Sequence, residues 1–440
     1  MDYDAFVIGA GTAGTTAAFK LKANGFKVGI VDNRPLGGTC ALRGCNPKKI
    51  LWGFADLAAK TGALNAITDA RIEWADLITF KRTFTDPVPG WTEEMLKDEG
   101  IDVYRKKAKF TGRQALEIDG KTVSAGKIVI ASGATPRKLG IAGEEFVTLS
   151  DAFLDLADLP QTILFIGGGY ISLEFANMVN AWGRKAIIFH SGPAILKGFE
   201  PDIVDLLMKG MKKRGIDVFT ESPVTGVRQE GKKLVVEAGD KEVGCDLAVH
   251  GAGRVPDIEE IDLKAGNVDA DAKGILVNEY LQSTTNKDVY AAGDAAGVGL
   301  PLTPTASMHG VIVAENITEG NTRKVNHFAT PSVVFSIPPL ASVGMTEKQA
   351  RDKSLDFRVN FTENTDGFDS RRLGLKSSGY KVLIDNKGGG ILGAHLHGEN
   401  ADEAINIFAL AMREKIPADN LAKVLWTFPT TISDIEDMVK

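Results

Sequence analysis

The pattern of apolar and polar positions predicts the same supersecondary unit twice along the chain. An apolar strand over 5–8 enters a glycine turn, and residues 15–21 follow with the apolar spacing of a helix. A second apolar strand over 27–31 completes this unit. The order repeats with strands at 162–166 and 185–189 and a helix between them. Strands that alternate with single helices indicate a parallel α/β fold in both places.

The remaining periodicity extends these two units and adds a third. From about residue 326 the pattern changes to an α+β arrangement without a nucleotide-binding signature. Helices are expected at 50–60, 75–85, 91–97, 346–353 and 401–414, and strands at 103–123, 127–131, 332–335, 380–384 and 390–395.

Composition and charge are those of an ordinary globular protein. The chain has 440 residues, of which 44% are hydrophobic and 25% charged, with a net charge of −6. No basic run invites nucleic acid or an anionic membrane, and no apolar run is long enough to span a bilayer. The acidic N-terminus does not resemble a signal peptide. Since three cysteines in so long a chain indicate a reducing compartment, we expect a cytoplasmic protein.

The first glycine turn has the spacing that binds a dinucleotide. Gly9, Gly11 and Gly14 lie between a strand and a helix, and the next strand ends at Asp32. The glycines let the backbone approach a pyrophosphate at the helix N-terminus, and the carboxylate can accept hydrogen bonds from a ribose. The alternative is a tight strand–helix turn without a ligand.

The second turn repeats the fingerprint through Gly167 and Gly169, with Ser172 in place of the third small residue. Its second strand ends at His190 and Ser191 rather than at an acidic residue. An acidic residue there favours NAD, whereas a nearby cation favours the additional phosphate of NADP. The available cations are Arg184, Lys185 and Lys197. We therefore expect NADPH, with NADH as the alternative if these residues form only a solvated surface.

Cys40 and Cys45 are five positions apart in a stretch with glycines on both sides. Zinc takes about four ligands, and no histidine or further cysteine lies near enough in sequence to complete a set. Two such thiols indicate a redox pair, although two unconnected buried thiols remain the alternative. In a regular helix they would be ~7.5 Å apart along the axis, and a disulfide needs Cα atoms within roughly 7 Å. The turn must therefore be distorted or Cys40 must lie outside the helix, and Gly44 permits the distortion.

Asn46 and Pro47 read as the N-cap and first residue of the helix that follows. Cys45 would then lie at the positive end of that helix, close to Lys48 and Lys49. Both features favour a thiolate at Cys45.

The ordered motifs resemble those of the class I pyridine nucleotide–disulfide oxidoreductases, the family of glutathione reductase, dihydrolipoamide dehydrogenase and mercuric reductase. The resemblance runs nearly end to end and implies that the first fingerprint binds FAD, the second NAD(P)H, and that the C-terminal unit forms a homodimer. The motifs lie at 9–14, 38–49, 131–136, 167–174, 253–254 and 291–294.

The implied architecture is α/β, with two Rossmann-like nucleotide-binding domains and a C-terminal α+β dimerisation domain. Residues 1–147 and 257–325 would bind FAD, 148–256 would bind NAD(P)H, and 326–440 would form the dimer. The candidate cofactor-binding residues are Gly9, Gly11, Gly14, Asp32, Thr39, Lys49, Gly133, Asp294, Thr303, Gly167, Gly169, Ser191, Lys197 and Gly253.

The resemblance also implies roles for five candidate catalytic residues. Cys45 corresponds to the thiol that faces the flavin and Cys40 to the thiol that attacks the substrate. Lys48 and Glu174 correspond to an ion pair beside the flavin, and Tyr170 to an aromatic gate over the nicotinamide. A buried lysine near a reduced flavin stabilises negative charge and needs a carboxylate partner.

The C-terminal segment departs from the thiol–disulfide members of the family. Phe428 occupies the place of their histidine, and Ser433 the place of its acidic partner. Because phenylalanine cannot protonate a leaving thiol, efficient turnover of a disulfide substrate is in doubt. Mercuric reductases also lack this histidine but carry a vicinal cysteine pair, which this sequence does not show.

Other residues offer little replacement for the missing acid. Cys245 is expected to be a structural thiol in the second nucleotide-binding domain. His309 is the best candidate for a substitute acid, with helix packing as the alternative, whereas His395 and His397 are expected to serve the fold.

We therefore expect an FAD-dependent NAD(P)H oxidoreductase that works through a Cys40–Cys45 disulfide. The expected acceptor is a small molecule or is carried by a protein: a disulfide, a metal ion such as Hg(II), or another electrophile. Two alternatives stay open: a flavin-based quinone or oxygen reductase with non-essential cysteines, and a flavin redox sensor or partner-binding subunit with low turnover.

Overall fold

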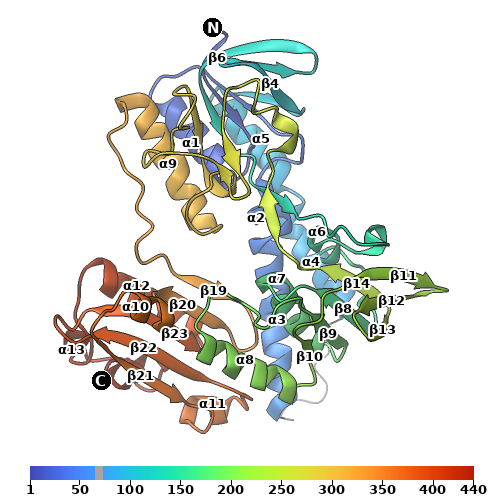
Figure 1. Ribbon diagram of the computed structural model, residues 1–440, viewed down its shortest axis with the longest axis vertical. Helices are drawn as coiled ribbons and strands as arrows, with labels where there is room; N and C mark the ends of the chain where they lie inside the picture. Colours follow the sequence, from blue (N-terminus) through green and yellow to red (C-terminus); the bar gives the residue numbers. More distant parts are fainter. Residues whose placement is uncertain (65–72) are drawn as a thin grey trace. The chain divides into compact units, whose positions relative to one another are not determined.

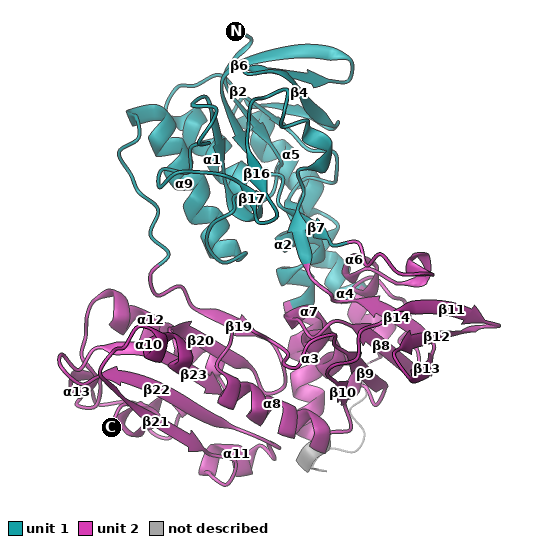
Figure 2. Ribbon diagram, in the orientation of Figure 1, with its two compact units in different colours: residues 1–48, 79–137, 254–327 teal, residues 49–78, 138–253, 328–440 magenta. Residues whose placement is uncertain are grey.

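The computed structural model describes residues 1–64 and 73–440, in two compact units that are shown in Figures 1 and 2. Unit 1 comprises residues 1–48, 79–137 and 254–327. Unit 2 comprises residues 49–78, 138–253 and 328–440. The chain thus leaves unit 1 after residue 48, returns at residue 79, leaves again after residue 137 and returns at residue 254. The boundaries of the three expected domains stay a prediction.

Unit 1 is built on a seven-stranded sheet in the order β3-β2-β1-β6-β5-β4, with β18 paired to β6. The strands around β1 run parallel, and β4 and β5 form an antiparallel extension through the first half of β6. The strand bounds are β1 Tyr3–Ile8, β2 Val28–Val31, β3 Asp102–Tyr104, β4 Ala108–Gly112, β5 Ala115–Ile118, β6 Lys121–Ile130 and β18 Val289–Ala291.

Both faces of this sheet are buried, as parallel strands require. Val7 of β1 packs on one side with helices α1 (Thr12–Ala23) and α9 (Thr303–Glu319), which lie side by side (Figure 1). Phe6 and Ile8 pack on the other side, against the antiparallel extension. The apolar run at residues 5–8 therefore has no polar face because neither side meets water. The unit also contains two helices, α2 (Gly38–Arg43) and α5 (Val88–Asp98). It contains two further strand pairs, β7 (Ala134–Pro136) with β15 (Arg254–Pro256) and β16 (Ala270–Asp271) with β17 (Gly274–Ile275).

Unit 2 contains a second parallel sheet in the order β10-β9-β8-β14, joined to an antiparallel sheet of β11, β12 and β13. The strand bounds are β8 Thr162–Ile166, β9 Lys185–Phe189, β10 Asp217–Phe219, β11 Gly226–Glu230, β12 Lys233–Ala238, β13 Lys241–Cys245 and β14 Leu247–His250. The helices are α6 Ser150–Phe153, α7 Tyr170–Ala181 and α8 Pro201–Lys213. Helix α7 packs in one apolar core with β8 and β9, which confirms the second predicted strand–helix–strand unit.

The C-terminal part of unit 2 is an antiparallel sheet in the order β19-β20-β23-β22-β21. One helix, α12, packs its apolar side into the core over β20 and β23. The predicted α+β arrangement is confirmed, although β20 and β21 were not expected. The strand bounds are β19 Ser332–Val334, β20 Leu340–Gly344, β21 Phe357–Glu363, β22 Gly379–Asp385 and β23 Ile391–His397. The helices are α10 Glu347–Asp352, α11 Phe368–Arg372, α12 Ala401–Arg413, α13 Ala418–Leu421 and α14 Ile435–Met438.

Two long helices pass from one unit to the other: α3 (Cys45–Leu64) and α4 (Trp74–Thr85). Helix α3 begins at Cys45, so the prediction of Asn46 as N-cap is wrong, and Pro47 lies within the first helical turn. Proline is tolerated there because the N–H groups of that turn have no partner within the helix. The same holds for Pro89 in the first turn of α5.

No helix in the described ranges 1–64 and 73–440 has the length and apolar character needed to cross a bilayer. The cytoplasmic location stays a prediction.

Candidate active site

The first fingerprint forms a backbone turn that only glycine can build. Gly9 has a φ of +104°, and a Cβ there would lie 2.3 Å from the carbonyl oxygen of Ala131. A Cβ on Gly14 would lie 1.9 Å from the carbonyl oxygen of Gly9. Helix α1 then begins without a side-chain cap and without an acidic residue in its first turn. Its first N–H groups are thus suited to bind a pyrophosphate.

Asp32 follows β2 and holds this turn in place. Its carboxylate accepts the N–H of Ala10 at 2.8 Å and the N–H of Arg34 at 2.8 Å. The remaining lone pairs of this half-buried carboxylate can accept hydroxyl groups of a ribose.

Further polar atoms in unit 1 lack partners among the described residues. The hydroxyls of Ser132 and Thr305 are buried and have no hydrogen-bond partner, and the carboxylate of Asp294 is half-buried. Burial raises the pKa of Asp294, and the charge of Arg254 partly opposes this. Buried polar atoms are normally paired, so these groups fit a polar ligand such as the ribityl and phosphate parts of a flavin dinucleotide.

The redox stretch lies directly on the first fingerprint. A Cβ on Gly38 would lie 2.5 Å from the Cα of Gly11, and the N–H of Gly37 donates to the carbonyl of Ala10 at 3.1 Å. Thr39 lies in α2, which ends at Gly44, where φ and ψ of −142° and −112° break the helix before α3 begins. The predicted distortion at Gly44 is therefore observed.

This break brings the two thiols together. Cys40 is half-buried on α2, and the neighbouring thiol of Cys45, the first residue of α3, is the largest influence on its pKa. The hydroxyl of Thr303, the first residue of α9, lies 3.3 Å from the sulfur of Cys45. The hydrogen bond to Cys45, burial and the charge of Cys45 raise the pKa of Cys40, whereas Thr303 lowers it.

The second fingerprint repeats the first, with two substitutions that the structure explains. Gly167 has a φ of +106°, and a Cβ there would lie 2.5 Å from the carbonyl oxygen of Gly251. Ser172 fits at the third position because a Cβ on Gly251 would lie 1.9 Å from its hydroxyl oxygen. Gly251, which lies across the turn, thus leaves room for the side chain of Ser172 at a position where the fingerprint normally has a smaller residue.

His190 takes the structural place of Asp32 in this second turn. Its Nδ1 accepts the N–H of Gly168 at 3.1 Å, and its Nε2 donates to the carbonyl of Ala194 at 2.9 Å. Ser191 and Lys197 are exposed nearby, and a Cβ on Gly192 would lie 3.5 Å from the Lys197 ammonium. Sequence analysis did not foresee that the imidazole replaces the carboxylate in this role. The equal spacing of 22 residues in both turns is the signal that could have shown it.

A family model described as "Pyridine nucleotide-disulphide oxidoreductase" matches residues 3–310, and that of its dimerisation domain matches residues 330–439. The chain belongs to the pyridine nucleotide–disulphide oxidoreductases. It is an enzyme of a family that uses FAD and NAD(P)H, and the dimerisation domain supports a homodimer. The unpaired polar atoms of unit 1 agree with an FAD site.

Relatives of this oxidoreductase have several different activities. It is 33% identical to a glutathione reductase of Burkholderia cepacia over 98% of this chain and 96% of the relative. It is 30% identical to a mercuric reductase of Staphylococcus aureus, over 96% and 79% of the two chains. A solved structure titled as a Cu(II) complex of the HOCl-induced flavoprotein disulfide reductase RclA from Escherichia coli has a TM-score of 0.90 at 26% identity, covering 100% and 99% of the chains.

The expected site residues are divided between the two units. Unit 1 holds Gly9, Gly11, Gly14, Asp32, Thr39, Cys40, Cys45, Lys48, Gly133, Asp294 and Thr303, and unit 2 holds Lys49, Gly167, Gly169, Tyr170, Glu174, Ser191, Lys197 and Gly253.

Residues of unit 2 that correspond to family site positions have partners within that unit. Glu174 is buried, and its carboxylate accepts the N–H of Phe335 at 3.0 Å. Tyr170 is exposed at the start of α7. The Lys49 ammonium forms an ion pair with Asp402 at 3.0 Å and lies 4.0 Å from the centre of the Phe335 ring. The Lys48–Glu174 ion pair, the gating role of Tyr170 and cofactor binding by Lys49 stay predictions.

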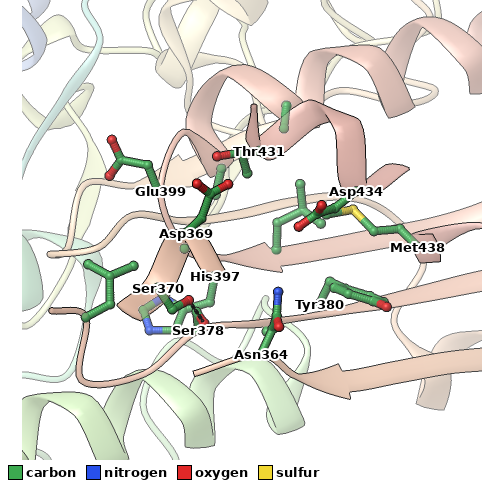
Figure 3. A pocket seen from close by; sticks show the side chains of 16 residues that line it. Asn364, Asp369, Ser370, Ser378, Tyr380, His397, Glu399, Thr431, Asp434 and Met438 are labelled. Atoms are coloured by element: carbon green, nitrogen blue, oxygen red, sulfur yellow. Dashed lines mark hydrogen bonds between the residues drawn. The ribbon is translucent and has the colours of Figure 1, made fainter. Parts of the chain in front are cut away.

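The C-terminal segment exposes the apolar residue that the resemblance places where an acid was expected. Phe428 is 82% exposed, and the hydroxyl of Ser433 donates to the carbonyl of Thr430. Beyond it, Thr431 and Asp434 line a pocket together with Asp369 (Figure 3). Burial and the negative charges of neighbouring aspartates raise the pKa of Asp434.

The histidines considered as replacements are packing residues. His309 is fully buried, with Nδ1 accepting the N–H of Gly293 at 3.2 Å and Nε2 bonded to His327 at 2.8 Å. Burial lowers the pKa of His309 to about 4. Buried His395 bonds to Ser342, and burial lowers the pKa of His397 to about 4. The packing interpretation of all three is therefore supported.

Cys245 is buried at the end of β13, and burial raises its pKa to about 11. A thiol of this kind is inert, which agrees with the structural role expected for it.

Proposed function

We propose that this oxidoreductase passes electrons from NADPH through FAD to a Cys40–Cys45 disulfide, and that the resulting dithiol reduces a soft or redox-active metal ion. The observation that carries the dithiol route is the position of Cys40 and Cys45 on either side of the helix break at Gly44. FAD, when bound, would supply the chemistry that accepts a hydride and passes on its two electrons. The chain's own part is to hold the two thiols on either side of the helix break at Gly44.

The choice of a metal ion follows from what the C-terminal segment lacks. A disulfide substrate releases a thiol that needs a proton, and Phe428 cannot donate one. A metal ion needs no such proton: one thiol and one thiolate reduce two Cu(II) ions to Cu(I), forming the disulfide and releasing one proton. Mercuric reductase is among the relatives, and two structural neighbours are titled as Cu(II) complexes, which supports this class of acceptor.

The preference for NADPH rests on His190. A carboxylate at its place, as at Asp32, would repel the additional phosphate of NADP, whereas an imidazole carries no negative charge. The exposed ammonium of Lys197 is available to pair with that phosphate.

The test is an anaerobic titration of the purified holoenzyme with NADPH and, in parallel, with NADH. A long-wavelength thiolate–flavin band at two electrons per flavin, followed by its loss on adding Cu(II) or Hg(II), is the expected result. Direct bleaching of the flavin without the band would overturn the dithiol route and leave quinone or oxygen reduction. Steady-state assays then compare both metal ions with glutathione disulfide.

Cysteine variants locate the chemistry. Cys40→Ser and Cys45→Ser should each abolish metal-ion reduction while FAD stays bound, because each removes one sulfur of the pair. Cys245→Ser is the matched control and should retain turnover. Full metal-ion turnover in either of the first two variants would contradict the proposal.

The nucleotide preference has its own test. His190→Asp should lower kcat/KM for NADPH more than for NADH, because the carboxylate repels the additional phosphate. An equal loss with both nucleotides would show that His190 only supports the turn.

A further inference from the structure

Two imidazoles lie behind the backbone turn that carries Asp294. His309 of α9 is fully buried, and its Nδ1 accepts the N–H of Gly293 at 3.2 Å. Its Nε2 lies 2.8 Å from Nε2 of His327, and the two rings meet edge to face with their centres 5.1 Å apart. All four residues belong to unit 1, which ends at His327. A chain of hydrogen bonds therefore runs from this turn through His309 to the last residue of the unit.

The turn depends on this chain for its backbone conformation. Gly293 has a φ of +65° and begins the one-turn 3-10 helix Gly293–Ala295. The preceding residue, Ala292, contributes no side-chain cap, so the N–H of Gly293 has its acceptor in His309. Because a buried N–H that loses its acceptor costs free energy, the imidazole fixes the backbone from which Asp294 projects.

The two hydrogen bonds also fix the protons of both rings. Nδ1 of His309 accepts, so the proton of the neutral ring is on Nε2, which donates to Nε2 of His327. His327 is then neutral too, with its proton on Nδ1. An additional proton on Nδ1 of His309 would face the N–H of Gly293, and one on Nε2 of His327 would face the N–H of His309. Each added proton therefore removes one of the two hydrogen bonds.

We infer that the His309–His327 pair is a positioning device, which holds the Asp294 turn in the form that binds FAD and releases it when either imidazole takes up a proton. The pair acts through the N–H of Gly293. The inference rests on the assignment of the Asp294 turn to the FAD site and does not depend on the identity of the electron acceptor.

The surrounding charges leave this behaviour to the pair itself. Burial and the charge of His327 lower the pKa of His309 to about 4, and burial lowers the pKa of His327. The charged groups on the neighbouring elements act on one another: Lys20 of α1 pairs with Glu315 of α9, Lys324 pairs with Glu279, and the charge of Arg254 acts on Asp294.

The direction of the pH dependence follows from the lowered pKa. In the released turn His309 binds a proton near its usual pKa of 6.5, whereas in the held turn it does so only near about 4. The turn is thus fully held above pH 6.5, and the hold weakens as the pH falls towards 4. Between pH 7.5 and pH 5.5 the balance shifts towards release by about tenfold.

The experiment measures how fast the purified holoenzyme releases FAD after dilution, as the rise of free-flavin fluorescence at pH 7.5 and pH 5.5. His309→Asn places an amide oxygen near the position of Nδ1 and cannot titrate. Its release at pH 7.5 should stay within about twofold of the native rate. Between pH 7.5 and pH 5.5, native release should accelerate about tenfold more than release from His309→Asn.

His309→Leu removes the acceptor and leaves the N–H of Gly293 buried without a partner. Release should then be about tenfold faster than native already at pH 7.5. Hydrogen–deuterium exchange of the peptide that carries Gly293, corrected for the intrinsic rate at each pH, is a second measurement. Exchange should be faster in His309→Leu at both pH values, and in the native protein only at pH 5.5.

Two further variants guard against a general loss of folding. His327→Leu leaves the fully buried ring in place but removes its partner, so release should change in the same direction as in His309→Leu and by less. His395→Gln is the matched control, because His395 is also a buried histidine with a lowered pKa but bonds to Ser342 in unit 2. It should keep the native release rate and its pH dependence.

The outcomes separate the histidine pair from the assignment of the turn. Equal pH dependence in the native protein and His309→Asn would overturn the role of the pair, and so would native release from His309→Leu. If Asp294→Ala releases FAD no faster than the native protein, the turn does not hold FAD, and the inference fails with that assignment. The proposed electron route to Cys40 and Cys45 is untouched by each of these results.

Discussion

Lys381 on β22 is a buried cation that three carboxylates surround. Its ammonium lies 2.9 Å from Glu200, 2.5 Å from Asp202 and 2.5 Å from Glu347, and its side chain is 3% exposed. Glu200 is as deeply buried, and its second oxygen accepts the N–H of Glu347 at 2.8 Å. This cluster joins β22 to the starts of α8 and α10 within unit 2, so it should contribute strongly to that unit's stability.

Lys381→Met removes the charge and keeps most of the hydrocarbon chain. Removing one partner of a buried ion pair typically costs about 3–5 kcal/mol because the other charge stays buried without compensation. Here three carboxylates lose their common cation. We therefore expect a loss in the free energy of unfolding of unit 2 near the upper end of that range, measured by urea titration at pH 7.5.

The pH dependence distinguishes charge from packing. In the native protein burial alone would lower the pKa of Lys381, but its hydrogen bonds to Asp202, Glu347 and Glu200 outweigh burial and raise it. The hydrogen bond from Lys381 lowers the pKa of Glu347, so this stabilisation is present at neutral pH and is lost as the pH falls through that lowered pKa. In Lys381→Met the uncompensated carboxylates bind protons more readily. The gap between variant and native protein should therefore narrow as the pH is lowered from 7.5 towards 4.

A divalent cation provides a second check. One oxygen from each of Glu200, Asp202 and Glu347 lies within 4.8 Å of the others, a spacing that suits a cation with oxygen ligands. Millimolar Ca²⁺ should therefore recover part of the stability of Lys381→Met and leave the native protein unchanged.

The control is Lys209→Met, which removes one half of a solvent-exposed ion pair with Glu363 and should leave the unfolding transition in place. A loss below about 1 kcal/mol in Lys381→Met would refute the reasoning. A large loss that is equal at pH 7.5 and pH 4.5 would show that packing, not charge, holds this cluster together.

Three further predictions concern single positions. Gly44→Ala places a Cβ 2.8 Å from the carbonyl oxygen of Thr39, so the thiols should separate and the thiolate–flavin band should be lost, as absorbance at two electrons per flavin would show. Burial raises the pKa of Asp434, so its negative charge lowers the stability of the fold as the pH rises. Asp434→Asn should therefore raise the thermal midpoint by about 1–2 °C at pH 7 and by less at pH 4. Asp240→Asn, at an exposed position, is the control. Phe428→His should raise turnover of glutathione disulfide by up to roughly 10²-fold, and an unchanged rate would mean that the missing acid is not the sole defect.

The sequence alone determined the elements that depend on short-range spacing. Both glycine turns appear as expected because Gly9 and Gly167 must adopt positive φ next to a neighbouring strand, which no other residue type tolerates well. The break at Gly44 could also be predicted from the sequence. Two thiols five positions apart in one regular helix are too far apart to form a disulfide. Residue preferences predicted the ends of helices less reliably. Helix α3 begins at Cys45 because the backbone turn at Gly44 separates it from α2, and Asn46 does not serve as its N-cap.

Only the tertiary structure decided which distant side chains meet. His190 replaces the carboxylate seen at Asp32 because its Nδ1 accepts the N–H of Gly168, which is equivalent to the N–H of Ala10 in the first turn, and its residue type alone does not predict this. Thr303 reaches Cys45, and Lys381 reaches Glu200, across 258 and 181 positions of sequence. Such contacts come from the packing of whole elements, and the period of apolar residues along one element carries no information about its partner. The sequence therefore determined the family and the two nucleotide-binding turns, and the packing of whole elements brought Thr303 to Cys45 and Lys381 to Glu200.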